Sequence, residues 1–294
     1  MRLSVIIATC ERPASLARLV ESLTPQLGDD TELLIAENGS ARQTAIPEVA
    51  GARVIHFYER APGKCRVQNH AIEQARGEIL AFLDDDVTAC ADYIAQVGHF
   101  FARYPEFAAM KGRVRAQEDP VKVAGRNAVY LDLPLVDHGD KVIEVPGVLG
   151  VNMAFRAAAL QRVGPFDERL GPGAGGHEEE TEMSARLRRA GYRIGYAPGA
   201  IVFHEVDPAR ADPARYIRIA HERGRCRVMH EHHSLGRVRI DRIVTVLRLG
   251  IARLSWAAPE RLAREQKRLA TADGMLEGLR EQRAGVFGTA PQSS

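Results

Sequence analysis

The feature that most constrains the fold of this chain is an alternation of short apolar runs with helix-type segments. The segments 14–27 and 65–76 place apolar residues at the three- and four-residue spacing of a helix. Strand-type apolar runs occur on either side of them, at 2–9, 31–40, 53–59 and 78–86. Continuous apolar runs are typical of strands buried on both faces, and strands that alternate with helices form α/β sheets. We therefore predict an α/β fold with a mostly parallel central sheet flanked by helices.

Three of the predicted strands end in polar clusters. Because ligands of open α/β sheets bind at the carboxyl ends of the strands, we expect a binding site where these clusters meet. The clusters are Thr9-Cys10-Glu11-Arg12, Glu37-Asn38-Gly39-Ser40 and Asp84-Asp85-Asp86.

The three consecutive aspartates indicate a metal site. Adjacent like charges repel each other unless a cation or hydrogen-bond donors compensate them. In an extended chain Asp84 and Asp86 would lie on one side and Asp85 on the other. A D-x-D pair of this kind suits Mg²⁺ or Mn²⁺ that phosphate oxygens also hold. A solvated acidic turn is the alternative interpretation.

A second acidic cluster, 178–182, follows the glycine-rich segment 170–176. Acids in the first turn of a helix are favoured by the helix dipole, which explains part of this cluster. A carboxylate near other negative charges can also have a raised pKa and act as a general base. The residues alone leave both readings open. His204, which ends an apolar run, is either a metal ligand or a structural histidine.

The composition excludes several classes of protein. The 294 residues are 45% apolar and 27% charged, as in an ordinary globular protein. No run reaches the roughly 18 apolar residues that a membrane-spanning helix needs, and the N-terminal run is too short for a signal peptide. The cysteines have no paired spacing, so we expect a reducing, cytoplasmic environment rather than disulfides or a zinc ribbon. They are Cys10, Cys65, Cys90 and Cys226.

The net charge of +2 conceals two regions of opposite sign. Residues 1–208 contain 23 Lys and Arg against 29 Asp and Glu, whereas residues 209–294 contain 17 against 9. The acidic part is consistent with carboxylates gathered for metal binding or catalysis. The basic part contains segment 237–258, in which aliphatic residues recur at helical spacing among arginines and Trp256 follows. Such a helix either binds a membrane surface, with the protein at its inner face, or packs on the catalytic domain or a second subunit as a homodimer.

Five segments together resemble the family 2 type of inverting glycosyltransferase with the GT-A fold. The resemblance covers residues 1–208 in unbroken order and rests on segments 4–23, 33–40, 63–87, 150–171 and 178–198. It implies a catalytic domain at 1–208, with a donor-binding half at 1–110 and an acceptor half at 111–208. Residues 209–294 form a basic helical extension.

The resemblance implies a role for individual residues. Asp86 and His204 would hold Mn²⁺ or Mg²⁺. Glu180 stands where the family has its catalytic base, usually an aspartate, and Glu179 lies on the acceptor side. The nucleotide-diphosphate sugar, a UDP-sugar in our expectation, would contact residues of several segments: Thr9, Glu11, Arg12, Glu37, Lys64, Arg66, Asp84, Asp85 and Asn152.

The implied activity is the addition of a single sugar to an acceptor hydroxyl, on a lipid-linked or other precursor of a cell-surface polysaccharide or glycoconjugate. The Gln-x-x-Arg-Trp motif of processive synthases is absent. A nicotinamide dehydrogenase is disfavoured because Cys10-Glu11-Arg12-Pro13 replaces a G-x-G-x-x-G turn. Two alternatives stay open: a catalytically silent sugar-nucleotide-binding module and a transferase that modifies a small natural product. Nucleic-acid binding is disfavoured because aliphatic rather than stacking aromatic residues interleave the basic tail.

Overall fold

The computed structural model describes residues 1–39 and 52–286, so Ser40 of the second polar cluster lies outside the described residues. The chain forms two compact units. The first contains Met1–Gln117, Leu133–Ala174 and Glu179–Glu205. The second contains the chain from Val206 onward together with Glu118–Asp132 and Gly175–Glu178, so two short segments from within the predicted catalytic domain join the C-terminal helices.

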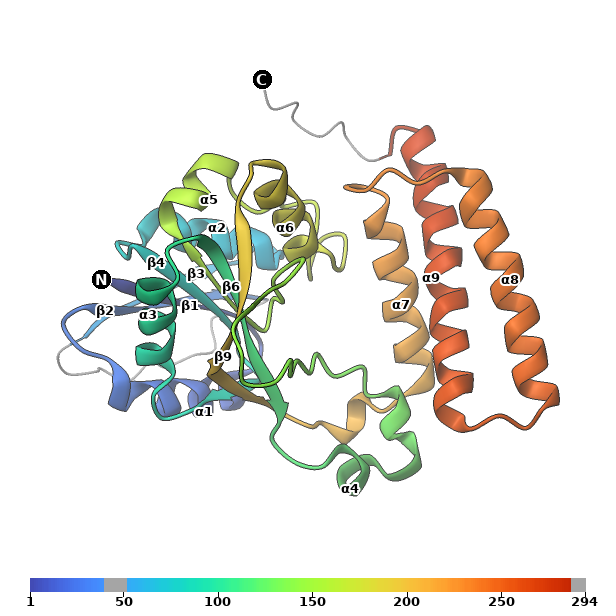
Figure 1. Cartoon of the computed structure of the whole chain (residues 1–294), viewed down its shortest axis with the longest axis horizontal. Helices are drawn as coiled ribbons and strands as arrows, with labels where there is room; N and C mark the ends of the chain where they lie inside the picture. The colour runs from blue at the N-terminus through green and yellow to red at the C-terminus, as the bar shows by residue number, and fades with distance from the viewer. Residues whose placement is uncertain (40–51, 287–294) are drawn as a thin grey trace. The chain divides into compact units, whose positions relative to one another are not determined.

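A single mixed sheet forms the centre of the first unit (Figure 1). Within the described residues its strand order is β3-β2-β1-β4-β8-β6-β9-β5, with β7 paired to β9. The strands β3, β2, β1 and β4 are parallel, and β8 is antiparallel to both of its neighbours, β4 and β6. The predicted α/β fold is therefore confirmed. The strands are β1 (Leu3–Cys10), β2 (Thr31–Asn38), β3 (Arg53–Glu59), β4 (Ile79–Asp84), β5 (Val87–Ala89), β6 (Phe107–Ala116), β7 (Ile143–Glu144), β8 (Asn152–Arg156) and β9 (Arg193–His204).

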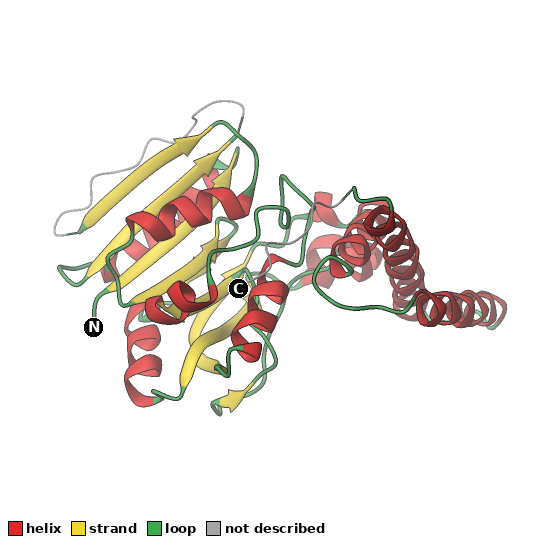
Figure 2. Cartoon of the chain, turned by 90° about the horizontal axis from the view of Figure 1, so that it is seen from above, coloured by secondary structure: helices red, strands yellow, loops and turns green. Residues whose placement is uncertain are grey.

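Helices cover both faces of this sheet (Figure 2). α1 (Pro13–Leu23) and α3 (Tyr93–Arg103) pack on one face, where their apolar side chains meet Val5 and Ile7 of β1. α2 (Lys64–Gln74), α5 (Ala157–Val163) and α6 (Glu179–Arg189) pack on the other, against Ile6 of β1 and Leu34 of β2. Burial on both faces explains why the strands are continuously apolar in sequence.

The register of the parallel strands brings the predicted polar clusters to one edge. Thr9 pairs with Glu37 across β1 and β2, and Ala8 pairs with Asp84 across β1 and β4. All three strands run in the same direction, so their carboxyl ends lie side by side. The sheet therefore assembles one site from segments that are far apart in the sequence.

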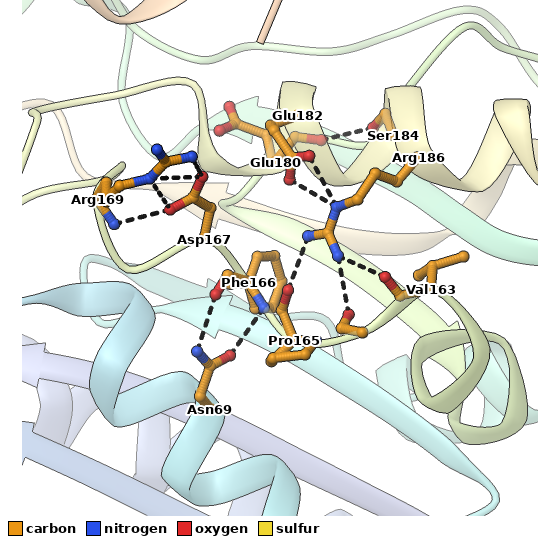
Figure 3. Close-up of polar contacts among 11 residues, drawn as sticks. Asn69, Val163, Pro165, Phe166, Asp167, Arg169, Glu180, Glu182, Ser184 and Arg186 are labelled. Carbon is orange, nitrogen blue, oxygen red and sulfur yellow. Dashed lines mark hydrogen bonds and ion pairs between the residues drawn. The ribbon is translucent and has the colours of Figure 1, made fainter. Parts of the chain in front are cut away.

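Two side chains hold the loop after α5 between α2 and α6 (Figure 3). Arg186 of α6 makes a 2.8 Å bond to Glu182 and donates to the carbonyls of Val163 at 2.7 Å and Pro165 at 2.8 Å. Asn69 of α2 donates to the carbonyl of Phe166 and accepts from its N–H, both at 2.9 Å. These bonds fix the position of α6, which carries the second acidic cluster.

The second unit is built from α7 (Pro213–Arg227), α8 (Leu235–Leu254) and α9 (Pro259–Arg283), and α9 packs against both of the other helices (Figure 1). Glycines let α7 and α9 approach closely, because a Cβ on Gly274 would lie 1.9 Å from the carbonyl oxygen of His221. No described helix is long and apolar enough to cross a membrane. The remaining short helices are α4 (Pro120–Ala124) and the 3₁₀ turns Thr24–Gln26, Gly125–Tyr130 and Pro208–Arg210.

The surroundings of two helical glycines predict opposite effects on stability when each is replaced by alanine. Gly274→Ala places a methyl group against the backbone of α7, so we expect the free energy of unfolding to fall by about 1–3 kcal/mol. Gly250→Ala on α8 meets nothing within 4 Å and should raise this free energy by up to about 1 kcal/mol. Urea denaturation measures both, and a destabilised Gly250→Ala variant would contradict this account.

Removing the amide of Asn69 should destabilise the first unit. In Asn69→Ala the N–H and carbonyl of Phe166 lose their partner in a buried place, which costs about 2–4 kcal/mol. Gln74→Ala, on an exposed turn of the same helix, is the matched control and should change stability by less than about 0.5 kcal/mol. Equal thermal unfolding of the two variants would show that the bonds to Phe166 contribute nothing.

Candidate active site

The three aspartates at the end of β4 point to different partners. β4 ends at Asp84, and Asp85 and Asp86 form a turn, so the alternation expected for an extended chain does not apply. Asp84 accepts a 2.6 Å hydrogen bond from Lys64, whereas Asp85 and Asp86 face Arg12. The expectation that Asp84 and Asp86 lie on one side, away from Asp85, is therefore wrong in this structure.

Arg12, in the loop after β1, neutralises the two buried aspartates. Its guanidinium lies 3.1 Å from Asp85 and 2.9 Å from Asp86, and Thr9 donates to Asp85 at 2.7 Å. Burial raises the pKa of Asp85, although Arg12 and the Thr9 hydroxyl oppose this shift. Burial lowers the pKa of Arg12, but the nearby aspartates outweigh it and raise that pKa overall. Two residues predicted to contact the donor thus hold the acidic turn in place.

Lys64 is a partly buried cation that connects the two acidic clusters. Its ammonium nitrogen lies 2.6 Å from Asp84 and 3.6 Å from Glu179. Burial alone would lower the pKa of Lys64, but Asp84, Glu179 and the nearby Glu180 raise it well above its usual range. The Lys64 backbone N–H donates to Pro172 at 2.9 Å, so it also ties the start of α2 to the glycine-rich loop.

The glutamates of the second acidic cluster have separate environments. Glu179 is buried beside Lys64, and Glu182 pairs with Arg186 at 2.8 Å. Glu178, in the second unit, lies 3.3 Å from Arg227 and 3.4 Å from His230 of that unit. Helix capping alone does not account for these ion pairs.

Glu180 is the partly exposed glutamate of this cluster, in the first turn of α6. Its backbone carbonyl accepts a 2.6 Å bond from Ser184, which is drawn in Figure 3. Burial lowers the pKa of Lys111 on β6, and the negative charge of Glu180 opposes that shift. Glu180 is therefore partly exposed and lies near the cations of Lys64 and Lys111. Lys111 is not among the predicted site residues. A lysine within the otherwise mostly apolar segment 107–114 is the feature of the sequence that could have indicated it.

Asp86 and His204 form the pair best placed to hold a divalent cation. The His204 Nε2 lies 3.5 Å from an oxygen of Asp86, and both side chains are buried. The His204 Nδ1 lies 2.7 Å from the carbonyl of Glu205, which can only accept, so Nδ1 donates this bond and leaves Nε2 on the side of Asp86. Among the described residues no group of three or more His, Cys, Asp or Glu side chains could hold a metal ion. Two protein ligands fit Mg²⁺ or Mn²⁺ only when phosphate oxygens and water complete the shell.

The predicted nucleoside end of the site has a strained backbone at Glu11. Its φ of 55° lies in the left-handed region, which non-glycine residues adopt rarely and often at functional positions. A Cβ on Gly39 would lie 3.1 Å from the Glu11 side chain, so the ends of β1 and β2 are close. Glu37 is buried, and its carboxylate lies 2.8 Å from the His56 Nε2 on β3.

Two predicted donor-binding residues lie elsewhere. Arg66 is half exposed and reaches Glu168 at 3.5 Å, so it does not converge with Lys64 on one anion site. Asn152 is completely buried on β8, where its amide donates to the carbonyls of Arg113 and Ala200 and accepts from Tyr93. This geometry corrects the expectation that Asn152 lines the sugar pocket. Its side chain bonds strand to strand inside the core.

The chain is similar to characterised transferases. The sequence model of glycosyl transferase family 2 matches residues 4–164. A pre-mycofactocin glycosyltransferase of Mycobacterium tuberculosis is 28% identical over 211 residues, which are 69% of this chain and 42% of that protein. A glucosyl-dolichyl phosphate glucuronosyltransferase of Haloferax volcanii is 25% identical over 225 residues, 72% of each chain. This chain thus spans less than half the length of the mycobacterial relative.

Solved structures share the fold. The mannosyltransferase PcManGT of Pyrobaculum calidifontis, in complex with GDP-Man and Mn²⁺, matches 98% of this chain and 76% of its own length, with a TM-score of 0.54 and 17% identity. Residues 1–349 of Staphylococcus aureus TarS match 98% of this chain and 93% of their own length, with a TM-score of 0.51 and 13% identity. Since the family model covers more than half of the chain and the fold agrees, this chain belongs to glycosyl transferase family 2 and has the GT-A fold.

Proposed function

We propose that this chain transfers one sugar from a nucleotide-diphosphate sugar, a UDP-sugar by our expectation, to an acceptor hydroxyl with inversion at the anomeric carbon. One observation carries the proposal. Glu180, in the first turn of α6, is partly exposed, whereas its neighbours Glu179 and Glu182 are buried. A general base needs access to its substrate, and Glu180 has it.

In this mechanism Glu180 removes the proton from the acceptor hydroxyl as its oxygen attacks the anomeric carbon. The attack comes from the face opposite the diphosphate, so a single displacement inverts the centre without a covalent intermediate. Lys64 keeps a positive charge between Asp84 and Glu179, which supports an ionised Glu180 through electrostatic attraction. Lys111 adds a second nearby cation.

Asp86 and His204 would hold a divalent cation, Mn²⁺ or Mg²⁺. When bound, such an ion supplies Lewis-acid stabilisation of the departing diphosphate. The protonated Nδ1 of His204 and the ion pair between Arg12 and Asp86 orient the two ligands before any ion arrives.

The acceptor in our proposal is a lipid-linked or other precursor of a cell-surface glycan, handled at the cytoplasmic side of a membrane. The haloarchaeal relative is named for transfer to glucosyl-dolichyl phosphate, which is consistent with a lipid-linked acceptor. A silent binding module has no need for a partly exposed glutamate at this position.

Glu180→Gln should lower the rate of sugar transfer by about 10²–10⁴-fold while binding of the nucleotide sugar stays within twofold. Glutamine keeps the size of the side chain and loses the proton acceptor. Nucleotide release from a panel of UDP-, GDP- and dTDP-sugars with Mn²⁺ measures the rate, and calorimetry measures donor binding. The exposed Glu73→Gln on α2 is the matched control. Full activity of Glu180→Gln would eliminate this base.

Asp86→Asn should weaken Mn²⁺-dependent binding of the nucleotide by at least about tenfold, because an amide is a poorer ligand than a carboxylate. Calorimetric titration of nucleotide with Mn²⁺ and with chelator measures this difference without requiring turnover. Asp29→Asn, in the exposed loop before β2, serves as control. Equal metal dependence in wild type and Asp86→Asn would remove Asp86 from the cation site.

A further inference from the structure

α8 carries an apolar stripe on its exposed side. The stripe consists of Ile240, Ile243, Val244, Leu247, Ile251 and Leu254. Their exposed fractions lie between 38% and 84%. At one turn per 3.6 residues these positions share one side of the helix, centred on Leu247. Isolated exposed apolar residues are ordinary, but a continuous row of this length marks an interaction surface.

The opposite side of α8 is the side that packs within the helical unit. Val238, Thr245, Leu249 and Ala252 are buried there, about half a turn away from the stripe. α9 provides the contact, and Arg242 bonds to Asp273 of α9 at 2.5 Å. α8 is therefore apolar on both sides, and the structure assigns only one of them to the protein core.

Arginines flank the stripe on both edges. Arg237 and Arg248 lie on one edge, Arg239 and Arg253 lie on the other, and all four are exposed. With Arg242 and the single acid Asp241, the helix carries a net charge of +4. Trp256 follows directly after α8 and is 95% exposed.

We propose that the exposed stripe of α8 docks on a lipid bilayer that contains anionic lipids. Aliphatic side chains would enter the boundary between headgroups and acyl chains, while the flanking arginines would contact anionic headgroups. Trp256 has the apolar ring and polar N–H that favour the membrane–water interface. This binding surface is separate from the proposed active site, so either proposal can fail without the other.

Charge distinguishes this partner from a second copy of the chain. Stacking two copies along the stripe would bring two helices of charge +4 together, with arginine edges facing arginine edges. Each arginine that lies near an anionic membrane surface instead raises the affinity for that surface by about fivefold.

The chain contains one tryptophan, so its fluorescence reports on the end of α8 alone. Adding equimolar phosphatidylglycerol and phosphatidylcholine vesicles to the full chain should shift the emission of Trp256 to the blue. Brominated lipid should quench it. Phosphatidylcholine vesicles alone should bind at least about fivefold more weakly, and added salt should weaken binding to the anionic vesicles.

A triple variant, Ile243→Ser, Leu247→Ser and Ile251→Ser, should weaken vesicle binding more than about tenfold. The matched control replaces exposed apolar residues outside α8, as Val121→Ser, Leu135→Ser and Ile143→Ser, and should bind like wild type. Circular dichroism checks that both variants stay folded. Absence of a blue shift, equal binding to neutral vesicles, or a dimer mass in light scattering that the triple variant abolishes would overturn the proposal.

Discussion

The active site depends on the compensation of like charges at the edge of a buried sheet. Carboxylates from the end of β4 and from the start of α6 repel each other wherever cations are missing. Lys64 lies between Asp84 and Glu179, and Arg12 lies against Asp85 and Asp86. Because burial makes such pairs sensitive to geometry, each cation fixes the positions of the backbone segments it joins.

The same interactions connect segments far apart in sequence. Lys64 bonds through its side chain to β4 and through its backbone to Pro172 in the glycine-rich loop. Position 173 requires glycine, because the Cβ of any other residue there would lie 2.6 Å from the backbone nitrogen of Gly63. Arg186 of α6 donates to the carbonyls of Val163 and Pro165 in the loop after α5. α6, which carries Glu180, is thus positioned by bonds to backbone groups, and sequence patterns predict such bonds poorly.

Apolar periodicity predicts the parallel strands and the helices between them well, because buried elements leave a regular pattern. α3 is not among the predicted elements, since it begins shortly after β5 and its apolar residues continue those of the strand region before it. The polar residues at the strand ends lie together as predicted, but the ion pairs that join them to one another were not predicted. Asn152 shows why: a polar residue in an apolar strand satisfies its amide inside the core as readily as it faces a ligand.

The C-terminal helices also show what sequence patterns alone do not predict. α8 has apolar residues on two opposite sides, and its sequence alone does not say which of these two faces meets protein. Packing against α9 decides this, because the face with Leu249 and Ala252 is buried, while the stripe around Leu247 stays exposed. The arginines then carry the remaining information. Four exposed arginines border the stripe, whereas Arg242 bonds to Asp273 of α9 on the packed side. The positive charge of the four bordering arginines therefore faces whatever covers the stripe.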